Sequence, residues 1–253
     1  MLLGIFSQNL SKIYRNFFFD TINIFYLSKK INYQYIKFCF IILILIIFQG
    51  IIGWYMVKSG LTEDITVSHY RLSIHLTTAI FIISMLFWLF KNISSHSNKF
   101  FFIFSKNNIP FQILILLVLL QIIIGAFVSG LDAGKIYQTW PLMGNNYVPD
   151  DLSFKKFINI FELDNHSLVQ FYHRNLAYLI IFYVVFLSIY IFKNKISLLY
   201  KPLKILLFFL IVQIILGICT LISGLNIYLA SLHQITSVLL ILSALNLYFF
   251  RTK

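Results

Sequence analysis

Charged residues are scarce in this chain of 253 residues, where Asp, Glu, Lys and Arg make up only 11% of the total. A soluble domain carries about 25% charged residues, so the composition excludes an ordinary soluble protein. Alternating segments of about 10 residues, which mark a transmembrane β-barrel, are also lacking. The two cysteines, Cys39 and Cys219, fall inside apolar runs and are interpreted as packing residues. What remains is an all-α polytopic membrane protein.

Apolar runs of about 20 residues, each long enough to cross a hydrocarbon core roughly 30 Å thick, recur along the chain. Residues 1–28 are ambiguous, because their stretch "FFFDTINIFYL" is apolar but short and interrupted by Asp20 and Asn23. The sequence predicts six spanning helices, listed here in chain order: 37–57, 70–90, 111–130, 168–192, 203–222 and 229–250.

Basic residues are distributed unevenly between the two sides that these six spans define. One side carries fourteen Lys and Arg with one acid, Asp20; the other carries six Lys and Arg with seven acids. The positive-inside rule places the basic side, and the C-terminus, in the cytoplasm or the mitochondrial matrix. The lysines are spread over short loops rather than forming one patch, so nucleic acid is a poor candidate partner. Phe, Ile, Leu, Asn, Lys and Tyr dominate the composition, and their AT-rich codons indicate an organellar or endosymbiont genome. We therefore expect a mitochondrial inner membrane, with the plasma membrane of an AT-rich alphaproteobacterium as the alternative.

Three stretches repeat one polar pattern, in which Gly follows Gln after four residues and Ser-Gly-Leu comes shortly after. The stretches are "FQGIIGWYMVKSGL" (48–61), "LQIIIGAFVSGL" (120–131) and "VQIILGICTLISGL" (212–225). Spans 37–57 and 70–90 therefore read as a duplicate of spans 203–222 and 229–250. Small residues permit close helix packing in membranes, Gly ends helices, and a mid-helix Gln is expected to bond to a neighbouring helix.

Three histidines lie at one depth, five or six residues inside the outer ends of their helices, or roughly 8–9 Å at 1.5 Å per residue. They are His75, His173 and His233. A helix histidine is often only a hydrogen-bonded core residue, but ionisable groups inside a membrane are costly and mark functional sites. We predict that His173 and His233 ligate one haem iron across the bundle. His69, His96 and His166 fall in or near loops and are expected to bind nothing.

Two arginines accompany these histidines. Arg71 lies four residues before His75 on the same helix face, and Arg174 adjoins His173. Either they pair with haem propionates, or they extend to the membrane interface. The long outer connection, 131–168, is a candidate lid over such a site.

Five segments resemble the haem A synthase family of mitochondria and alphaproteobacteria, in order over about residues 38–250. They are "QGIIGWYMVKSGL", "HYRLSIHL", "SGLDAGKIYQTWPLMGNNYVPDDL", "VQFYHRNLAYL" and "ASLHQITSVLL". The resemblance implies eight helices in two four-helix halves, and oxidation of the C8 methyl of haem O to a formyl. It also implies haem b between His173 and His233, and substrate haem at His75. The family's haem O synthase becomes a candidate partner.

The resemblance divides the chain into a degenerate or truncated segment 1–36, the remainder of the substrate half 37–110, and the cofactor half 111–253. The family's catalytic Glu, three residues before a second substrate-side His, maps near "FSQNLSKIYRNFFF", which has neither residue. The catalytic residue is thus unassigned. Either the true start lies upstream, or a separate polypeptide or another copy supplies the missing helices, or the segment is degenerate.

Two rival interpretations stay open on the sequence alone. The first is a bis-histidine b-type electron carrier without synthase activity. The second is a transporter or scaffold whose duplicated bundle binds no haem. The candidate metal ligands are His75, His173 and His233. The haem b pair, His173 and His233, is common to the synthase and the electron carrier, whereas His75 belongs to the substrate site that the electron carrier has lost. None of the three binds haem in a transporter or scaffold.

Overall fold

The computed structural model describes residues 33–60, 67–149, 151–152 and 162–252. Two units make up the chain, Met1–Ile47 and Phe48–Lys253. The described part of the first unit is the beginning of helix α2, and the helical bundle belongs to the second. The predictions for residues 1–28, and for the segment expected to match the Glu-bearing helix, lie outside the described residues.

All six predicted spans are confirmed as helices long and apolar enough to cross a membrane, with ends within four residues of the expected ones. Within the described residues the secondary structure is helical, apart from one isolated bridge between Met143 and Asn146. The chain is therefore a multi-pass, all-α membrane protein. The helices are α2 (Tyr33–Gly60), α3 (His69–Ser94), α4 (Ile109–Gly130), α5 (His166–Lys193), α6 (Tyr200–Ile222) and α7 (Ile227–Arg251).

Local sequence signals explain where the helices begin. The Asn165 side chain accepts a hydrogen bond from the Leu168 amide at the start of α5. Asn226 does the same for the amides of Tyr228 and Leu229 at the start of α7. Each bond satisfies an amide that has no partner inside its own helix. Two residues of the α6–α7 turn have a left-handed backbone, Gly224 with φ +71° and Leu225 with φ +63°. Glycine adopts this conformation without steric cost.

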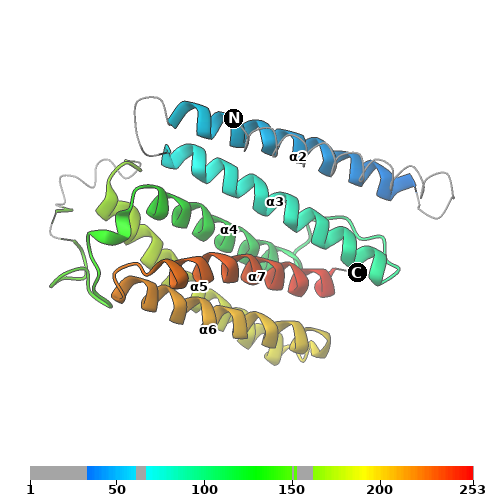
Figure 1. The fold of residues 1–253 in the computed structure, drawn as a ribbon. Helices are drawn as coiled ribbons and strands as arrows, with labels where there is room; N and C mark the ends of the chain where they lie inside the picture. Colours follow the sequence, from blue (N-terminus) through cyan, green and yellow to red (C-terminus); the bar gives the residue numbers. More distant parts are fainter. Residues whose placement is uncertain (1–32, 61–66, 150, 153–161, 253) are drawn as a thin grey trace. The chain divides into compact units, whose positions relative to one another are not determined.

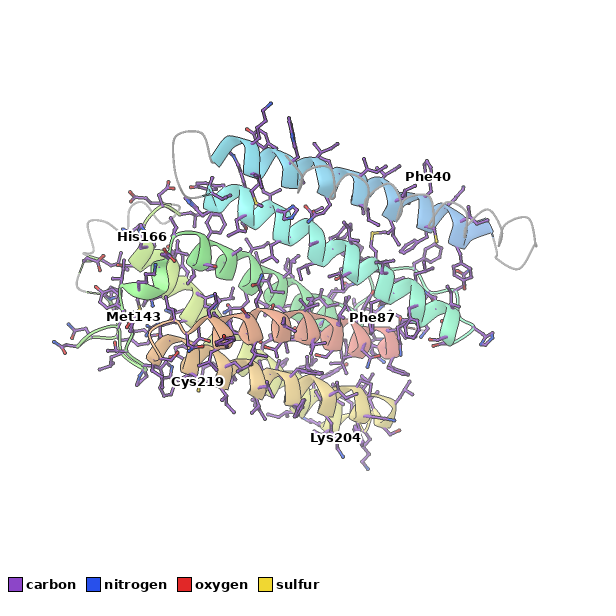
Figure 2. The ribbon with its side chains drawn as sticks, viewed as in Figure 1. Phe40, Phe87, Met143, His166, Lys204 and Cys219 are labelled. Carbon is purple, nitrogen blue, oxygen red and sulfur yellow. The ribbon has the colours of Figure 1, made fainter. Side chains whose placement is uncertain are left out.

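Helices α3 to α7 lie side by side, with α4 packed against α3, α5 and α7, and α6 packed against α7 (Figure 1). Met143 and His166 lie at one end of this bundle and Lys204 lies at the opposite end (Figure 2). We call these two ends outer and inner, after the orientation that the sequence predicts. Two 3-10 turns, η1 (Ala133–Lys135) and η3 (Ser197–Leu199), join helices at the outer and inner ends respectively.

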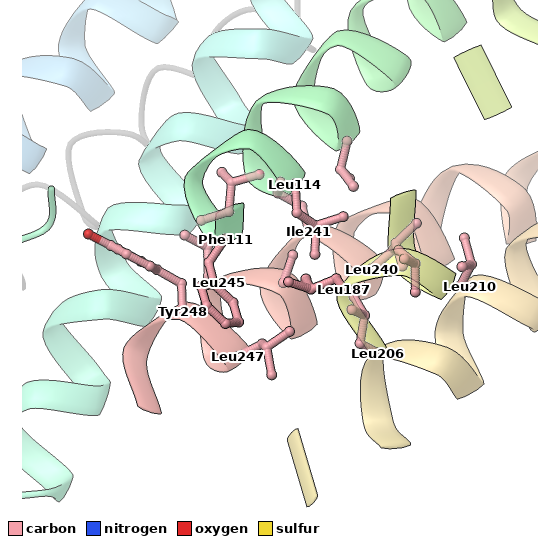
Figure 3. Close-up of a cluster of buried hydrophobic side chains, with 14 of the residues drawn as sticks. Phe111, Leu114, Leu187, Leu206, Leu210, Leu240, Ile241, Leu245, Leu247 and Tyr248 are labelled. Atoms are coloured by element: carbon pink, nitrogen blue, oxygen red, sulfur yellow. The ribbon is translucent and has the colours of Figure 1, made fainter. Parts of the chain in front are cut away.

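The tightly packed core occupies the inner half of α4 to α7 (Figure 3). Leu187, Leu206 and Leu247 are each fully buried there, with 0% of their surface exposed. The outer halves of α6 and α7 are packed less closely. Helix α7 has no buried residue from Ile227 to Leu239, whereas eight are buried between Leu240 and Phe249. The inner half thus holds the helices together, and the outer half carries the candidate site.

The inner loop between α3 and α4 is tied to the end of α7. Lys99 donates from Nζ to the Phe249 carbonyl at 2.9 Å and also to the Thr252 carbonyl. Its ammonium lies 4.6 Å from the Phe249 ring centroid. Burial, and then the charge of Lys91, lower the pKa of Lys99. These contacts fix the C-terminal turn of α7 against the basic side of the bundle.

Candidate functional site

Each of the three helix histidines rests against a glutamine from the preceding helix. In every case the glutamine Nε2 donates a hydrogen bond to the histidine's own backbone carbonyl, at 3.0, 3.0 and 3.1 Å in chain order. The pairs are Gln49–His75, Gln121–His173 and Gln213–His233. The expectation that these glutamines bond to a neighbouring helix is confirmed, and the neighbour is the histidine helix in all three cases.

The same amide nitrogen also reaches the imidazole ring. Gln49 Nε2 lies 3.3 Å from His75 Nε2, and Gln213 Nε2 lies 3.4 Å from His233 Nε2. Gln121 Nε2 lies 3.2 Å from Nδ1 and 3.3 Å from Nε2 of His173. One side chain therefore contacts both the backbone and the ring of the same histidine, which restricts how the ring can turn.

The glycine one helical turn after each glutamine provides room for the ring. A Cβ atom added to Gly53, Gly125 or Gly217 would stand 3.0, 3.1 or 3.0 Å from the Cε1 atom of the paired histidine. That is closer than ordinary van der Waals contact. The repeated Gln-Gly spacing thus builds three cradles, each with an imidazole edge against bare backbone. We call each Gln, Gly and His set a histidine cradle.

Two of these histidine cradles bring their rings together. The ring centroids of His173 on α5 and His233 on α7 are 6.5 Å apart, with an angle of 75° between the ring planes. An imidazole nitrogen lies about 2 Å from a metal that it ligates, so centroids of two ligands on opposite sides of one metal stand roughly 6–7 Å apart. The observed spacing would allow His173 and His233 to hold one metal ion between them.

Other features of the site also fit a large apolar ring system such as haem. The outer halves of α6 and α7 hold half-buried and exposed residues rather than a closed core. Nδ1 of His233 is buried without a recorded hydrogen-bond partner. Among the described residues no group of three or more His, Cys, Asp and Glu is placed to hold a metal ion. Two facing imidazoles are the donor set of a bis-histidine haem rather than of a zinc site.

Arg174 faces the outer loop. Its guanidinium donates to the carbonyls of Tyr137 and Thr139, each at 2.9 Å, and of Leu142 at 3.1 Å. Gln170, one turn earlier on α5, donates to the Tyr137 carbonyl as well, at 2.9 Å. The loop is therefore fastened to α5 beside His173, and these contacts test neither sequence interpretation of this arginine. The predicted propionate contact stays a prediction.

His75 belongs to the histidine cradle between α2 and α3, and the structure places Arg71 near it. The Arg71 guanidinium stacks over the Tyr55 ring, 4.9 Å from its centroid. Buried Nδ1 of His75 and Oε1 of Gln49 have no recorded hydrogen-bond partner. His75 thus has the same glutamine and glycine contacts as His233, at the position that the sequence repeat predicted.

The other three histidines lie apart from these cradles. His69 Nε2 approaches Asp164 Oδ1 at 3.0 Å, outside hydrogen-bond geometry, while Gly130 packs against its Cβ. His166 lines an open acidic cleft of about 270 Å³ at the outer surface. His96 is exposed in the inner turn after α3. That they bind no ligand stays a prediction.

Sequence reasoning missed the role of the glutamines and glycines toward the histidines. It treated α2–α3 and α6–α7 as duplicates, whereas α4–α5 carries the same cradle, so a two-helix hairpin is the smallest repeated unit. The available signal was the order of the elements: each Gln-Gly helix is followed by a helix with a histidine near its outer end. Only the three-dimensional pairing shows that the two features touch.

The fold and site define a class, a helical membrane bundle of repeated hairpins with paired histidines. Comparison with known proteins narrows it: residues 13–245 match the COX15-CtaA family, described as "Cytochrome oxidase assembly protein". The chain belongs to this family.

Several relatives bear the name "Heme A synthase". The chain is 44% identical to that of Pelagibacter ubique over 224 residues, which are 86% of this chain and 63% of the relative. It is 41% identical to that of Wolbachia pipientis wMel, over 87% of this chain and 62% of the relative. It is 37% identical to that of Ehrlichia canis, over 98% of this chain and 69% of the relative. The chain thus spans slightly less than two thirds of the length of the first two.

Proposed function

We propose that this chain carries the haem A synthase activity of its relatives, converting the C8 methyl of haem O to a formyl group. The observation that carries the proposal is the His173–His233 pair, with ring centroids 6.5 Å apart where α5 meets the loosely packed outer half of α7. The names of the relatives support it. A bound haem b would supply one-electron redox chemistry at this position.

The overall conversion takes one methyl group and one water to one formyl group, four protons and four electrons. The electrons need an external acceptor, which we assign to the class of membrane or soluble one-electron carriers. His173 and His233 would hold the haem b iron, and His75 would face the substrate haem. Its cradle matches that of His233, which supports a second haem position of the same kind.

The outer loop contributes enclosure in this proposal. Arg174 and Gln170 fasten the segment from Tyr137 to Leu142 next to His173, so the loop limits water access to the outer end of the site. Exclusion of water strengthens electrostatic interactions within a site and prevents side reactions of reactive intermediates. Rearrangement of Arg174 toward a propionate would couple cofactor binding to this loop.

The orientation is also part of the proposal. The basic inner end, with Lys99 and Lys204, faces the cytoplasm or the mitochondrial matrix, and the histidine end faces the opposite side. Delivery of haem O by its synthase would take place within the same membrane. A protease-sensitive tag after residue 253 tests this: cleavage in inverted vesicles, but not in right-side-out ones, is expected.

The decisive experiment is the absorption spectrum of the purified full chain, followed by supply of haem O and mass analysis of the extracted haems. We expect a bis-histidine haem b spectrum and a formyl-haem product. His233→Ala should remove the haem b band, whereas His96→Ala, a substitution in the exposed inner turn, should leave it. A wild-type protein without a Soret band would refute haem binding. Haem b without formyl product would refute the synthase activity alone.

A further inference from the structure

Each of the three glutamines contacts its histidine at two points, the backbone carbonyl and the ring. Each amide nitrogen donates to the histidine backbone carbonyl and stands within 3.2–3.4 Å of a ring nitrogen. The backbone contact anchors the amide, and the ring contact then limits rotation of the imidazole about its side-chain bonds. An amide N–H can only donate, so the glutamine does not accept the ring N–H as the carboxylate and carbonyl partners of metal-bound histidines do. Its effect on the ring is positional, because it limits the orientations in which the imidazole can reach a metal.

We propose that Gln49, Gln121 and Gln213 are positioning residues, which set the orientation of the imidazoles of His75, His173 and His233 toward their haems. The inference rests on the proposed haem sites and adds the residues that hold the ligands. The glycine of each cradle fixes one edge of the ring, and the glutamine restrains the ring from the side.

The three cradles differ in how firmly the glutamine itself is held. The Thr236 hydroxyl donates to Gln213 Oε1 and so fixes that amide at both ends. The position three residues after the histidine is Leu176 in the second cradle, which has no hydroxyl, and Thr78 in the first, which donates to the Ile74 carbonyl instead. Oε1 of Gln49 and of Gln121 is buried without a recorded partner. His233 is therefore the most firmly oriented of the three ligands.

A purely structural role is the competing explanation, because polar side chains join helices in membranes through such bonds. The chain offers a matched control for it. Gln112, on the same helix as Gln121, is buried and donates to the Ile103 carbonyl and to the Tyr248 hydroxyl, both at 3.0 Å. Its replacement removes the same donor from the inner half of the bundle, away from the histidines.

The test compares Gln121→Met, Gln213→Met and the control Gln112→Met in the purified full chain, each with its native haem. Met keeps the length of Gln and removes the donor. We expect the first two to shift the electron paramagnetic resonance g values and the midpoint potential of haem b, and to weaken haem retention by about 10-fold. Gln112→Met should lower thermal stability and leave the g values unchanged.

Thr236→Val supplies a milder variant in case Gln213→Met does not fold. It frees the Gln213 amide and should shift the same g values in the same direction by a smaller amount. Unchanged g values and potential in folded, haem-loaded glutamine variants would overturn the positioning role while leaving the haem site intact. A wild-type chain without haem would instead overturn the proposed function together with this inference.

Discussion

The imidazole of His233 packs with its edge against Gly217, and a Cβ at that glycine would lie only 3.0 Å from His233 Cε1. Gly217→Ala should therefore push the ring by a few tenths of an ångström without unfolding the helix. We expect a changed haem b spectrum and weaker haem retention, measured by visible absorption before and after dialysis against a haem-binding protein.

Gly50→Ala is the matched control for that substitution. Gly50 is also a helical glycine, but nothing lies within 4 Å of its added Cβ. Alanine is the better helix former by roughly 0.5–1 kcal/mol. The control should leave the spectrum unaltered and stability equal or slightly higher. Equal spectra for the two alanine variants would contradict the close fit of the His233 ring.

The positions of the helices could be read from the sequence because hydrophobic length alone decides them in a membrane. The depth of the three histidines followed from the same reasoning. Which side chain each one touches did not, because the period of one helix defines a face and not the neighbour that covers it. Gln121 illustrates this, because it lies 52 residues before His173 in the sequence and contacts it only when α4 and α5 pack together. The partners of Arg174 depended on a loop conformation that no periodicity encodes.

Loss of the Arg174 guanidinium should release the outer loop. Arg174→Gln removes charged donors that hold the carbonyls of Tyr137, Thr139 and Leu142, and a hydrogen bond to a charged group is worth about 1.5–3 kcal/mol. We expect amide hydrogen exchange in residues 137–147 to accelerate at least tenfold, measured by mass spectrometry.

Lys135→Ala is the control for the loop, since it removes a cation from the same region. Lys135 pairs with Asp132 at 2.7 Å, but both side chains are more than 60% exposed, at 62% and 65%. Such surface pairs contribute about 0–1 kcal/mol. Exchange in the loop should change little in this variant. Equal acceleration in Lys135→Ala and Arg174→Gln would show that Arg174 is not what fastens the loop.

A substitution in the inner core should lower stability without changing the haem site. Leu206→Ala creates a cavity at a position with 0% exposure, and such changes cost about 2–5 kcal/mol in closely packed interiors. We expect a clear fall in the unfolding temperature with an unchanged haem b spectrum. Phe208→Ala, on the same helix but at a side chain that is 60% exposed, should barely affect the unfolding temperature. A spectral change in Leu206→Ala would show that the two halves of the bundle are coupled.

The buried Tyr248 hydroxyl should stabilise the inner end more than a side chain with one hydrogen bond does, because it accepts two. It accepts from the Ile103 amide at 3.1 Å and from Gln112 Nε2 at 3.0 Å. Tyr248→Phe leaves two donors without this acceptor, at about 1–3 kcal/mol for each group that stays buried and unpaired. Tyr183→Phe is the comparison, because the Tyr183 hydroxyl donates to the Pro110 carbonyl, and an unpaired carbonyl is tolerated better than an unpaired amide. The unfolding temperature should therefore fall further for Tyr248→Phe than for Tyr183→Phe. The reverse order would contradict the anchoring of the α3–α4 loop through Tyr248.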